Sequence, residues 1–475
     1  MPEIVPGRYI VVFKDQSNRQ ITSEAADFAN QRINSILSDL SIHQDSLIHR
    51  YKYALKGFAA KLSENQISQL GKDPRVDLVA PDLKYRATHF RPNLPFNDAV
   101  FDDPGGQIVP WGVARIGGGT RVVGKKAWII DGGIELNHPE LNVDAINSES
   151  FVKDKPNPND EDGHGTFIAG IIAAKEDPQG SIIGVAANAQ VVAVRVCDDG
   201  LCYTSDTIQG VNHAASNYNI GDVANISLGW PVSGHPYIDT ALSVLEDAIK
   251  TAADDGLMFT IAAGNDAEHA DNMSPARIVN QNVWTISAFD ENDNFASFSN
   301  FGNPPIDFSA PGVDIVSFAI GGGTFVDSGT SFAAPHFAGL LLAADNIATD
   351  GTVNNDPDND PDLIAVNGSL FPSLSVSLSG PTSLDSGVEG TWSADAQNGT
   401  GSYTYQWYYK NDSGSAWQSG GSNSSIFSHT FYNTSSDPIY ASVRVVVNDG
   451  VNDPVEDLVV VYIEGDCSDP MTCPQ

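Results

Sequence analysis

Short apolar runs alternate with helix-patterned stretches from residue 111 to about residue 348. Runs such as AWIID, VVAVRV, VANISLG and LMFTIAAGN have the length of buried strands, and longer stretches with helical spacing separate them. Strands that are apolar throughout and are separated by helices indicate a parallel sheet with crossover helices. We therefore predict an α/β domain over residues 110–349, with helices on both faces of a parallel sheet.

The first 86 residues show the pattern of a smaller α+β unit. Apolar residues recur at helical spacing behind Ser23, and Ser63 and Gln66 form a capping-box pattern at the start of a second helix. The predicted order for residues 1–86 is βαββαβ, with strand-like runs at residues 9–13, 47–51, 57–62 and 76–79. Residues 87–109 are rich in Pro, Asn, Asp and Gly, which indicates an exposed linker.

Beyond the α/β domain the pattern changes twice. Residues 350–370 include the acidic, proline-broken stretch DPDNDPD, which indicates a second connector. Its alternate carboxylates resemble a calcium loop, but the glycine and the closing glutamate of an EF-hand are missing, so a solvated linker is favoured. Residues 371–465 alternate apolar and polar side chains between turn signals, which predicts an all-β, immunoglobulin-like sandwich before a tail over residues 466–475.

The chain is strongly acidic, with 60 Asp and Glu against 25 Lys and Arg and a formal net charge of −35. This charge argues against nucleic acid or an anionic membrane as a partner, because phosphate groups repel it. No run approaches the roughly 20 apolar residues of a membrane helix. The opening Met1-Pro2-Glu3 lacks the charged and apolar regions of a signal peptide.

The four cysteines form two close pairs, Cys197 with Cys202 and Cys467 with Cys473. Local pairing is the simplest of the three possible connectivities, and it suggests an oxidising, extracellular compartment. Neither pair has a second Cys or His pair at zinc-finger spacing, so a structural metal is the weaker interpretation. We expect a secreted protein whose export signal is absent from the chain as given.

Three stretches of the α/β domain carry groups for nucleophilic catalysis. WIIDGGIELNHPEL places Asp131 at a strand end, DGHGTFIAGII places His164 at a helix start, and SGTSFAAPHFAG places Ser331 at another helix start. A histidine can take the serine proton during attack on a carbonyl and return it to the leaving group. A carboxylate fixes the histidine tautomer and stabilises its cation. Together these residue types predict an acyl-transfer site.

A serine in the first turn of a helix has unpaired backbone N–H groups beside its oxygen, and these favour a developing oxyanion. The stretch TIAAGND ends a further strand and offers the side-chain amide of Asn265 as a second oxyanion donor. Pro335 lies close to the expected helix start, so we predict that its missing N–H breaks no internal hydrogen bond.

Each of these motifs has an ordinary interpretation when taken alone. Asp-Gly-Gly is usually a turn, a single histidine is usually structural, and Gly-Thr-Ser is a common helix cap. All four groups, however, are expected at strand ends or helix starts of one α/β domain. The ordinary interpretations do not explain that agreement, so we favour a catalytic site.

The order Asp131, His164, Ser331 resembles that of the subtilisin-like serine proteases. IIDGGI is similar to the family's Asp motif, HGTFIAG to its His motif, GTSFAAPH to its Ser motif and AAGN to its oxyanion segment, with further similarity to the proteinase K branch. Residues 1–86 resemble the family's inhibitory propeptide. Gly132 departs from the pattern, because the family more often has Thr or Ser there, and this bears on the positioning of Asp131.

The resemblance implies a secreted serine endopeptidase made as an autoinhibited zymogen, with the propeptide as intramolecular inhibitor and a maturation cut between about Tyr85 and Pro110. It also implies two extended segments that line the primary specificity pocket and pair with the substrate backbone, formed by Ser227, Leu228, Gly229, Ala262, Ala263 and Gly264. Their small, uncharged side chains suggest broad specificity with an apolar or aromatic preference. Substrates would be proteins and peptides.

The same resemblance implies no cofactor for the chemistry and a monomeric enzyme. Relatives often bind structural calcium, and Asp290 loosely matches a ligand position. A rival hypothesis from another class is a catalytically silent binding or adhesion protein that acts through its C-terminal domain. The complete set of four catalytic groups favours the enzyme.

Overall fold

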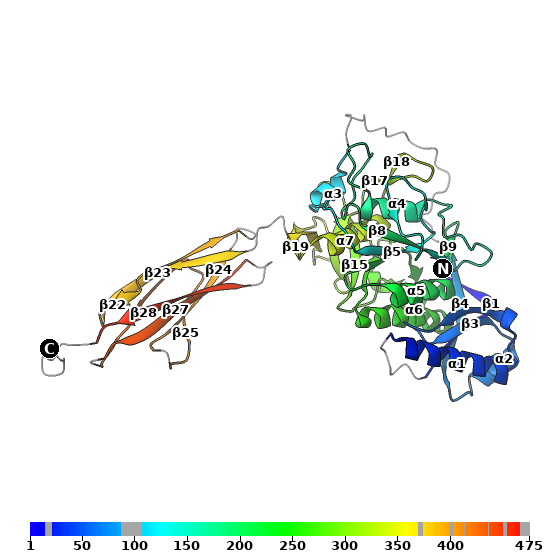
Figure 1. Cartoon of the computed structure of the whole chain (residues 1–475), viewed down its shortest axis with the longest axis horizontal. Coiled ribbons are helices and arrows are strands. Elements are labelled where there is room, and N and C mark those ends of the chain that lie inside the picture. Colours follow the sequence, from blue (N-terminus) through cyan, green and yellow to red (C-terminus); the bar gives the residue numbers. More distant parts are fainter. Residues whose placement is uncertain are drawn as a thin grey trace. The chain divides into compact units, whose positions relative to one another are not determined.

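A computed structural model describes residues 1–14, 21–86, 107–368, 374–398, 403–412, 414–435, 437–449 and 454–465. The chain divides after Asn367 into two units, Met1–Asn367 and Gly368–Gln475 (Figure 1). Each unit has its own hydrophobic core.

Residues 1–86 adopt the predicted βαββαβ order. The N-cap Thr22 accepts a hydrogen bond from the Ala25 N–H, and the Ser63–Gln66 capping box is present at the second helix. Antiparallel pairing gives the strand order β2-β3-β1-β4. The elements are β1 (Glu3–Phe13), α1 (Ser23–Asp39), β2 (Leu47–Tyr51), β3 (Gly57–Lys61), α2 (Glu64–Leu70) and β4 (Val76–Arg86).

The centre of the first unit is the predicted parallel sheet, with strand order β16-β15-β13-β11-β5-β8 through its middle. All neighbours in this series pair in parallel. Most of their side chains are buried, as expected for a sheet that is covered on both faces. The strands are β5 (Lys126–Asp131), β8 (Gln190–Arg195), β11 (Val223–Ile226), β13 (Met258–Ala262), β15 (Val283–Phe289) and β16 (Ile306–Pro311).

Two pairs of helices cover opposite faces of this sheet, and Figure 1 shows α4 on one side of β5 and α5 and α6 on the other. Helices α5 and α6 share one apolar core with alternate sheet residues such as Trp128 and Phe259, whereas α4 and α7 share another with residues such as Ile129. The helices are α4 (His164–Ala173), α5 (Thr204–Asn217), α6 (Pro236–Asp255) and α7 (Thr330–Ala343), with the short α3 (Trp111–Arg115) before the sheet. The predicted α/β arrangement is therefore confirmed.

Part of the expected acidic linker belongs to the sheet. Residues Ile347–Thr352 form β19 and Leu363–Asn367 form β20, which pairs in parallel with β16. The stretch DPDNDPD is the loop that joins these two strands, and the division between units falls after Asn367. Proline and aspartate marked a loop correctly, but the apolar LIAV that follows them belongs to β20, which lies between β16 and the edge strand β19.

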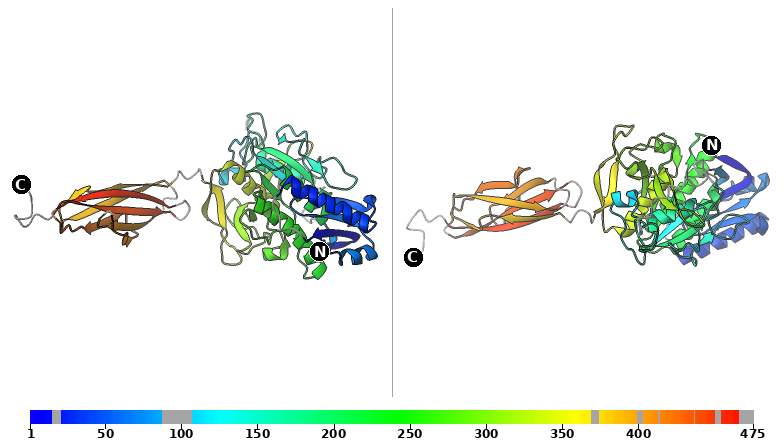
Figure 2. Two further views of the ribbon diagram at one scale, coloured as in Figure 1. Left: turned by 60° about the horizontal axis from the view of Figure 1, so that its bottom comes forward. Right: turned by 90° about the horizontal axis from the view of Figure 1, so that it is seen from above.

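The N-terminal sheet lies against α5 and α6 (Figures 1 and 2). Its strand β4 also pairs with a strand of the α/β domain. Lys84, Tyr85 and Arg86 pair antiparallel with β10 (Leu201–Tyr203). Strand β10 forms a hairpin with β9 (Cys197–Asp198), and the predicted Cys197–Cys202 disulfide closes it. Cys467 and Cys473 lie outside the described residues.

A buried carboxylate joins β4 to the first turn of α5. Asp82 has no exposed surface and accepts hydrogen bonds from the Ser205 N–H (2.9 Å), the Ser205 hydroxyl (2.7 Å) and the Thr204 hydroxyl (2.8 Å). Arg8 forms an ion pair with Asp82 at 2.8 Å. A residue of the N-terminal sheet therefore supplies the cap that α5 lacks in its own sequence.

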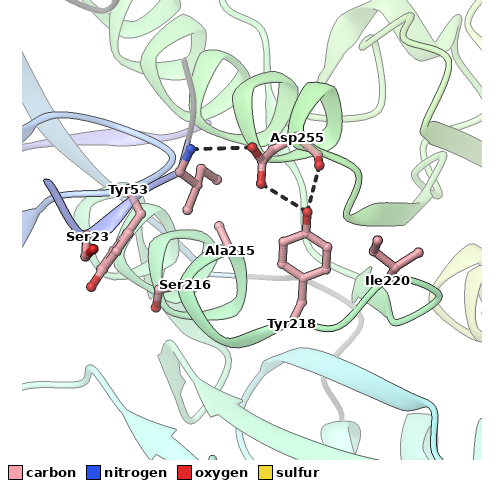
Figure 3. Close-up of a pocket in the computed structure, with 8 residues that line it drawn as sticks. Ser23, Tyr53, Ala215, Ser216, Tyr218, Ile220 and Asp255 are labelled. Carbon is pink, nitrogen blue, oxygen red and sulfur yellow. Dashed lines mark hydrogen bonds between the residues drawn. The ribbon is translucent and has the colours of Figure 1, made fainter. Parts of the chain in front are cut away.

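The interface also contains a cavity of about 380 Å³, shown in Figure 3. The Tyr218 hydroxyl donates to the carbonyl oxygen of Asp255 at 2.8 Å and lies 3.0 Å from its carboxylate, while the Ile21 N–H donates to that carboxylate at 3.4 Å. The lining residues come from both sides of the interface: Ile21, Ser23, Tyr53, Ala215, Ser216, Tyr218, Ile220 and Asp255. Packing between the two parts is thus incomplete at this point.

The second unit contains two β-sheets, with strand orders β21-β23-β26 and β22-β28-β27-β24-β25 in its described residues. Trp392 and Trp407 are buried in the core between them. The strands are β21 (Ser375–Ser379), β22 (Ser383–Leu384), β23 (Glu389–Gln397), β24 (Thr404–Lys410), β25 (Gln418–Ser422), β26 (Ile426–Thr430), β27 (Ile439–Asn448) and β28 (Val455–Ile463). This matches the predicted all-β character; the immunoglobulin likeness stays a prediction.

Among the described residues, none of the helices combines the length and the apolar character that crossing a membrane requires.

The Asp82 contacts generate the first prediction. Replacing Asp82 with Ala removes the acceptor of three hydrogen bonds and one of the two carboxylates that pair with Arg8, so the N-terminal sheet should hold α5 less firmly. In the full chain with Ser331→Ala, amide hydrogen exchange at Ser205 should be roughly tenfold faster or more. Asp77→Ala, an exposed change on the same strand, is the matched control. Equal exchange in the two variants would contradict the capping role.

Candidate active site

Asp131 is the last residue of β5 and is 2% exposed. Its Oδ1 accepts a hydrogen bond from the Gly132 N–H at 2.7 Å. The Nδ1 of His164 lies 2.9 Å from Asp131 Oδ1 and 3.0 Å from Oδ2. The carboxylate is therefore fixed on both sides, and it determines which ring nitrogen of His164 carries a proton.

His164 is the first residue of α4, and the preceding loop holds it there. Asp160 accepts hydrogen bonds from the N–H groups of Gly163 (2.8 Å) and Thr166 (2.9 Å) and from the Thr166 hydroxyl (2.7 Å), which completes the first turn. Gly165 allows the close approach to β5, because a Cβ there would overlap the carbonyl oxygen of Gly133. These contacts bring His164 to the end of the strand that carries Asp131.

Ser331 lies in the first turn of α7, as predicted. Phe332, the next residue, contacts Phe167 of α4 with ring centroids 4.5 Å apart and the His164 ring at 5.8 Å. The aromatic contact between α4 and α7 therefore brings the starts of both helices together. The helix starts that carry His164 and Ser331 therefore lie at the same end of the parallel sheet as Asp131.

Pro335 affects the helix differently from the prediction. Helix α7 begins at Thr330, so an N–H at position 335 would have bonded to the Ser331 carbonyl. The Ser227 hydroxyl donates to that carbonyl at 2.8 Å instead. The Ser331 hydroxyl in turn lies 3.4 Å from the carbonyl oxygen of Ser227. The proline thus frees an acceptor that ties the start of α7 to the end of β11.

Asn265 follows β13 and caps the same helix. Its Oδ1 accepts hydrogen bonds from the Thr330 N–H at 2.8 Å and from the Thr330 hydroxyl at 3.0 Å. The Thr330 hydroxyl also accepts from the Gly264 N–H at 3.1 Å. With its oxygen held in this way, the side chain of Asn265 keeps its NH₂ group for another partner.

The electrostatics of the site favour a protonated His164. Burial lowers its pKa, but the charge and hydrogen bond of Asp131, followed by the charges of Asp162 and Asp160, outweigh this and raise the pKa above its usual range. Burial and the charges of Asp160 and Asp131 also raise the pKa of Asp162. A neutral His164, which a general base must be, is therefore favoured at alkaline pH.

The structure places the expected substrate-binding segments beside this site. Ser227, Leu228 and Gly229 directly follow β11, and Ala263 and Gly264 follow Ala262 at the end of the neighbouring parallel strand β13. Both backbone groups of Ala263 already have partners, because its N–H donates to the Ile286 carbonyl and its carbonyl accepts from Asn300. Pairing of Ala263 with a substrate backbone, which stays a prediction, would therefore have to use the second lone pair of its carbonyl oxygen.

Sequence reasoning missed the strand edge that does accept another chain segment. Leu201–Tyr203 pair with β4, although they form too short a run to stand out as a strand. It also missed Arg195, which is 1% exposed and donates to the carbonyls of Asn159 (2.8 Å) and Cys197 (3.3 Å). Arg195 thereby links the loop before His164 to the disulfide-closed hairpin. A charged residue at the end of VVAVRV was the available signal.

The carboxylate of Asp290 faces its own turn. It accepts hydrogen bonds from the N–H groups of Asn292 and Asn294, both at 2.9 Å. In the part of the chain that the structure describes, no group of three or more His, Cys, Asp or Glu side chains is arranged to hold a metal ion. The geometry does not support the expected calcium site at Asp290.

Comparison with known families agrees with the fold. A model of the subtilase family, Peptidase S8, matches residues 125–355, and a model of the peptidase inhibitor I9 family matches residues 8–88. The I9 match covers the βαββαβ sheet that packs on α5 and α6.

Two curated relatives match much of the chain. Subtilisin-like protease 5 of Arthroderma gypseum is 33% identical over 373 residues, which are 73% of this chain and 84% of that protein. Subtilisin-like protease 1 of Trichophyton verrucosum is 32% identical over 370 residues, with the same two shares. Among solved structures, S41 Psychrophilic Protease has a TM-score of 0.42 and 29% identity over 50% of this chain and 84% of its own. The chain belongs to the subtilase family of serine peptidases and carries an I9 inhibitor domain ahead of the peptidase domain.

The contact between Asp131 and His164 generates the second prediction. Asp131→Asn removes the charge and the ionic hydrogen bond that raise the pKa of His164, so this pKa should fall. Titration of the imidazole resonances by NMR, in full chains that also carry Ser331→Ala, measures the change. Asp177→Asn, an exposed carboxylate elsewhere on the surface, is the control. An unchanged pKa in the Asp131 variant would show that this carboxylate does not set the charge of His164.

Proposed function

We propose that the chain is a serine endopeptidase that hydrolyses peptide bonds with Ser331 as nucleophile, His164 as general base and acid, and Asp131 as the group that orients His164. The observation that carries this proposal is the buried Asp131–His164 contact at 2.9 Å, placed at the helix start that adjoins the first turn of α7. Membership of the subtilase family supports the same assignment.

In the proposed reaction, the neutral Nε2 of His164 takes the hydroxyl proton as Ser331 Oγ attacks the peptide carbonyl. The imidazolium that forms is stabilised by Asp131, which has two oxygens within 3.0 Å of Nδ1. The same proton then passes to the leaving amine, and an acyl-enzyme remains. A water molecule repeats the cycle: it gives a proton to His164 and attacks the acyl carbon, and Ser331 Oγ then leaves the acyl group and takes the proton back from His164.

The negative charge on the carbonyl oxygen needs donors that are already in position. Ser331 lies in the first turn of α7, so its own backbone N–H has no intrahelical partner. The NH₂ group of Asn265 is the second proposed donor, because Thr330 holds the oxygen of that amide. The backbone N–H of Ser331 and the side-chain NH₂ group of Asn265 would together form the oxyanion hole.

We further propose that residues 1–86 inhibit the peptidase domain until they are cleaved. Lys84–Arg86 already pair with the edge strand Leu201–Tyr203, and an extended peptide substrate would use the same edge by strand addition. The proposed processing region between about Tyr85 and Pro110 lies largely outside the described residues.

The remaining parts of the proposal concern substrate and setting. Small, uncharged residues at 227–229 and 262–264 fit a broad specificity with an apolar or aromatic preference. The disulfide fits an oxidising, extracellular setting, and the enzyme would act as a secreted monomer without a cofactor for its chemistry. Nucleic acid and membrane surfaces fit poorly with the net charge of −35.

Labelling with a fluorophosphonate probe tests the proposed nucleophile. The activated wild-type protein should react covalently, and Ser331→Ala should lose the label entirely, because the probe needs an activated hydroxyl. Ser328→Ala, three residues earlier in the chain, should keep it. Unlabelled wild type after removal of residues 1–86 would contradict the proposal and support the rival binding or adhesion function.

Asn265→Ala tests the proposed oxyanion donor. The variant should lower kcat by about 10² to 10³-fold, the effect seen when an oxyanion donor is removed from subtilisin, while KM changes little. Asn265→Asp is the companion variant, since it can keep the acceptor for Thr330 but replaces the NH₂ group with a second oxygen. If the Asp variant retained wild-type kcat, the amide would have no role in stabilising the oxyanion.

A further inference from the structure

Residue 132 is glycine, where the family more often has Thr or Ser. The reason is a lack of room for a side chain, not an unusual backbone conformation. Gly132 is not among the glycines with positive φ, so other residues could adopt its backbone conformation. A Cβ at this position, however, would lie 2.9 Å from both carboxylate oxygens of Asp162 and 3.2 Å from its Cγ. The carboxylate of Asp162 therefore fills the space that a side chain at residue 132 would need.

One hydrogen bond from the backbone of Asp162 and one to its carboxylate place the residue in this space. Its N–H donates to Asp160 Oδ1 at 3.0 Å, and its own Oδ1 accepts from the His164 N–H at 3.2 Å. On the other side, Gly132 donates its N–H to the carboxylate of Asp131 at 2.7 Å. The contact between residues 132 and 162 thus joins the backbone beside Asp131 to the backbone of His164.

Resting on the proposed function, we propose that Asp162 is a positioning residue for the catalytic pair: it occupies the place of the missing side chain at Gly132, and it holds the His164 backbone against the end of β5. Asp162 then acts through His164 and Asp131 and needs no contact with substrate. The small residue at 132 and the carboxylate at 162 form a matched pair. The effect of a substitution at one position should therefore depend on the residue at the other.

Asp162 also contributes to the charge around His164. The charged groups that face His164 are Asp131 at the end of β5 and Asp160 and Asp162 in the loop before α4. From α7 the His164 ring meets the uncharged ring of Phe332. Each of the three carboxylates favours the imidazolium, so loss of one negative charge lowers the pKa of His164. The base form of His164 would then be present at lower pH.

The steric part of the proposal is tested with Gly132→Ser, Asp162→Ala and the double variant, each expressed as the full chain and measured after activation with a peptide substrate. Gly132→Ser should lower kcat by about 10²-fold, because the new side chain pushes the carboxylate and the His164 backbone apart. Adding Asp162→Ala to Gly132→Ser should raise kcat roughly tenfold above that of Gly132→Ser alone, since it removes the atoms that collide. Additive losses, or a fully active Gly132→Ser, would overturn the proposal.

The electrostatic part is tested with Asp162→Asn, which keeps the shape and the acceptor for the His164 N–H but removes the charge. The acid limb of its kcat/KM profile should move to lower pH by about one unit, because Asp162 carries its charge in the alkaline range in which His164 titrates. Glu161→Gln is the matched control: it removes one charge from the adjacent residue, whose carboxylate instead contacts Lys155 and Arg195. A profile for Asp162→Asn identical to that of the control would overturn the proposal.

These experiments separate this inference from the proposed function. If activated wild type does not react with a fluorophosphonate, the proposed function itself fails. Suppose instead that wild type reacts while the losses of Gly132→Ser and Asp162→Ala are additive, or while the acid limb of Asp162→Asn does not move. In either case only the role of Asp162 fails. Should Gly132→Ser prevent maturation, recovery of mature protein in the double variant supports the matched pair, and failure of both leaves the Asp162→Asn profile to decide.

Discussion

The first turn of an α-helix leaves backbone N–H groups without partners inside the helix, and in this protein three helices find those partners elsewhere in the chain. Asp160 supplies them for α4, Asn265 for α7 and Asp82 for α5. The first two caps place His164 and Ser331, and the third attaches the inhibitor domain to the peptidase domain. The candidate active site and the attachment of the inhibitor domain thus depend on the same kind of interaction, the capping of a helix N-terminus by a side chain.

Two glycines allow the close approach between α4 and β5. Gly165 approaches the carbonyl of Gly133, and Gly132 leaves room for Asp162, so the start of α4 lies directly against the end of β5. The phenylalanine contact at 4.5 Å then sets α7 beside α4. The result is a cluster of carboxylates around one histidine in a chain that is already acidic. Attraction between these carboxylates and the imidazolium explains why His164 favours its protonated form.

Much of this arrangement was predictable from the sequence, for physical reasons. The apolar runs that end in Asp131 and near Asn265 predicted buried parallel strands, and carboxyl ends of such strands meet at one edge. The starts of α4 and α7 were recognisable because small residues and hydroxyls gather there. Asp162 and Arg195 were missed, since each looks like an ordinary loop or strand-end charge. Only their contacts with Gly132 and with the hairpin at Cys197 distinguish them.

The sequence by itself determined the order of the elements, the class of the fold and the residue types available for chemistry, because hydrophobic periodicity and turn residues are local properties of the chain. Tertiary structure alone decided that Ser227 satisfies the carbonyl freed by Pro335, that Leu201–Tyr203 is the edge paired with β4, and that residues after 350 return to the sheet. These outcomes depend on contacts between segments far apart in sequence. No local pattern specifies such contacts, because each partner alone is compatible with many neighbours.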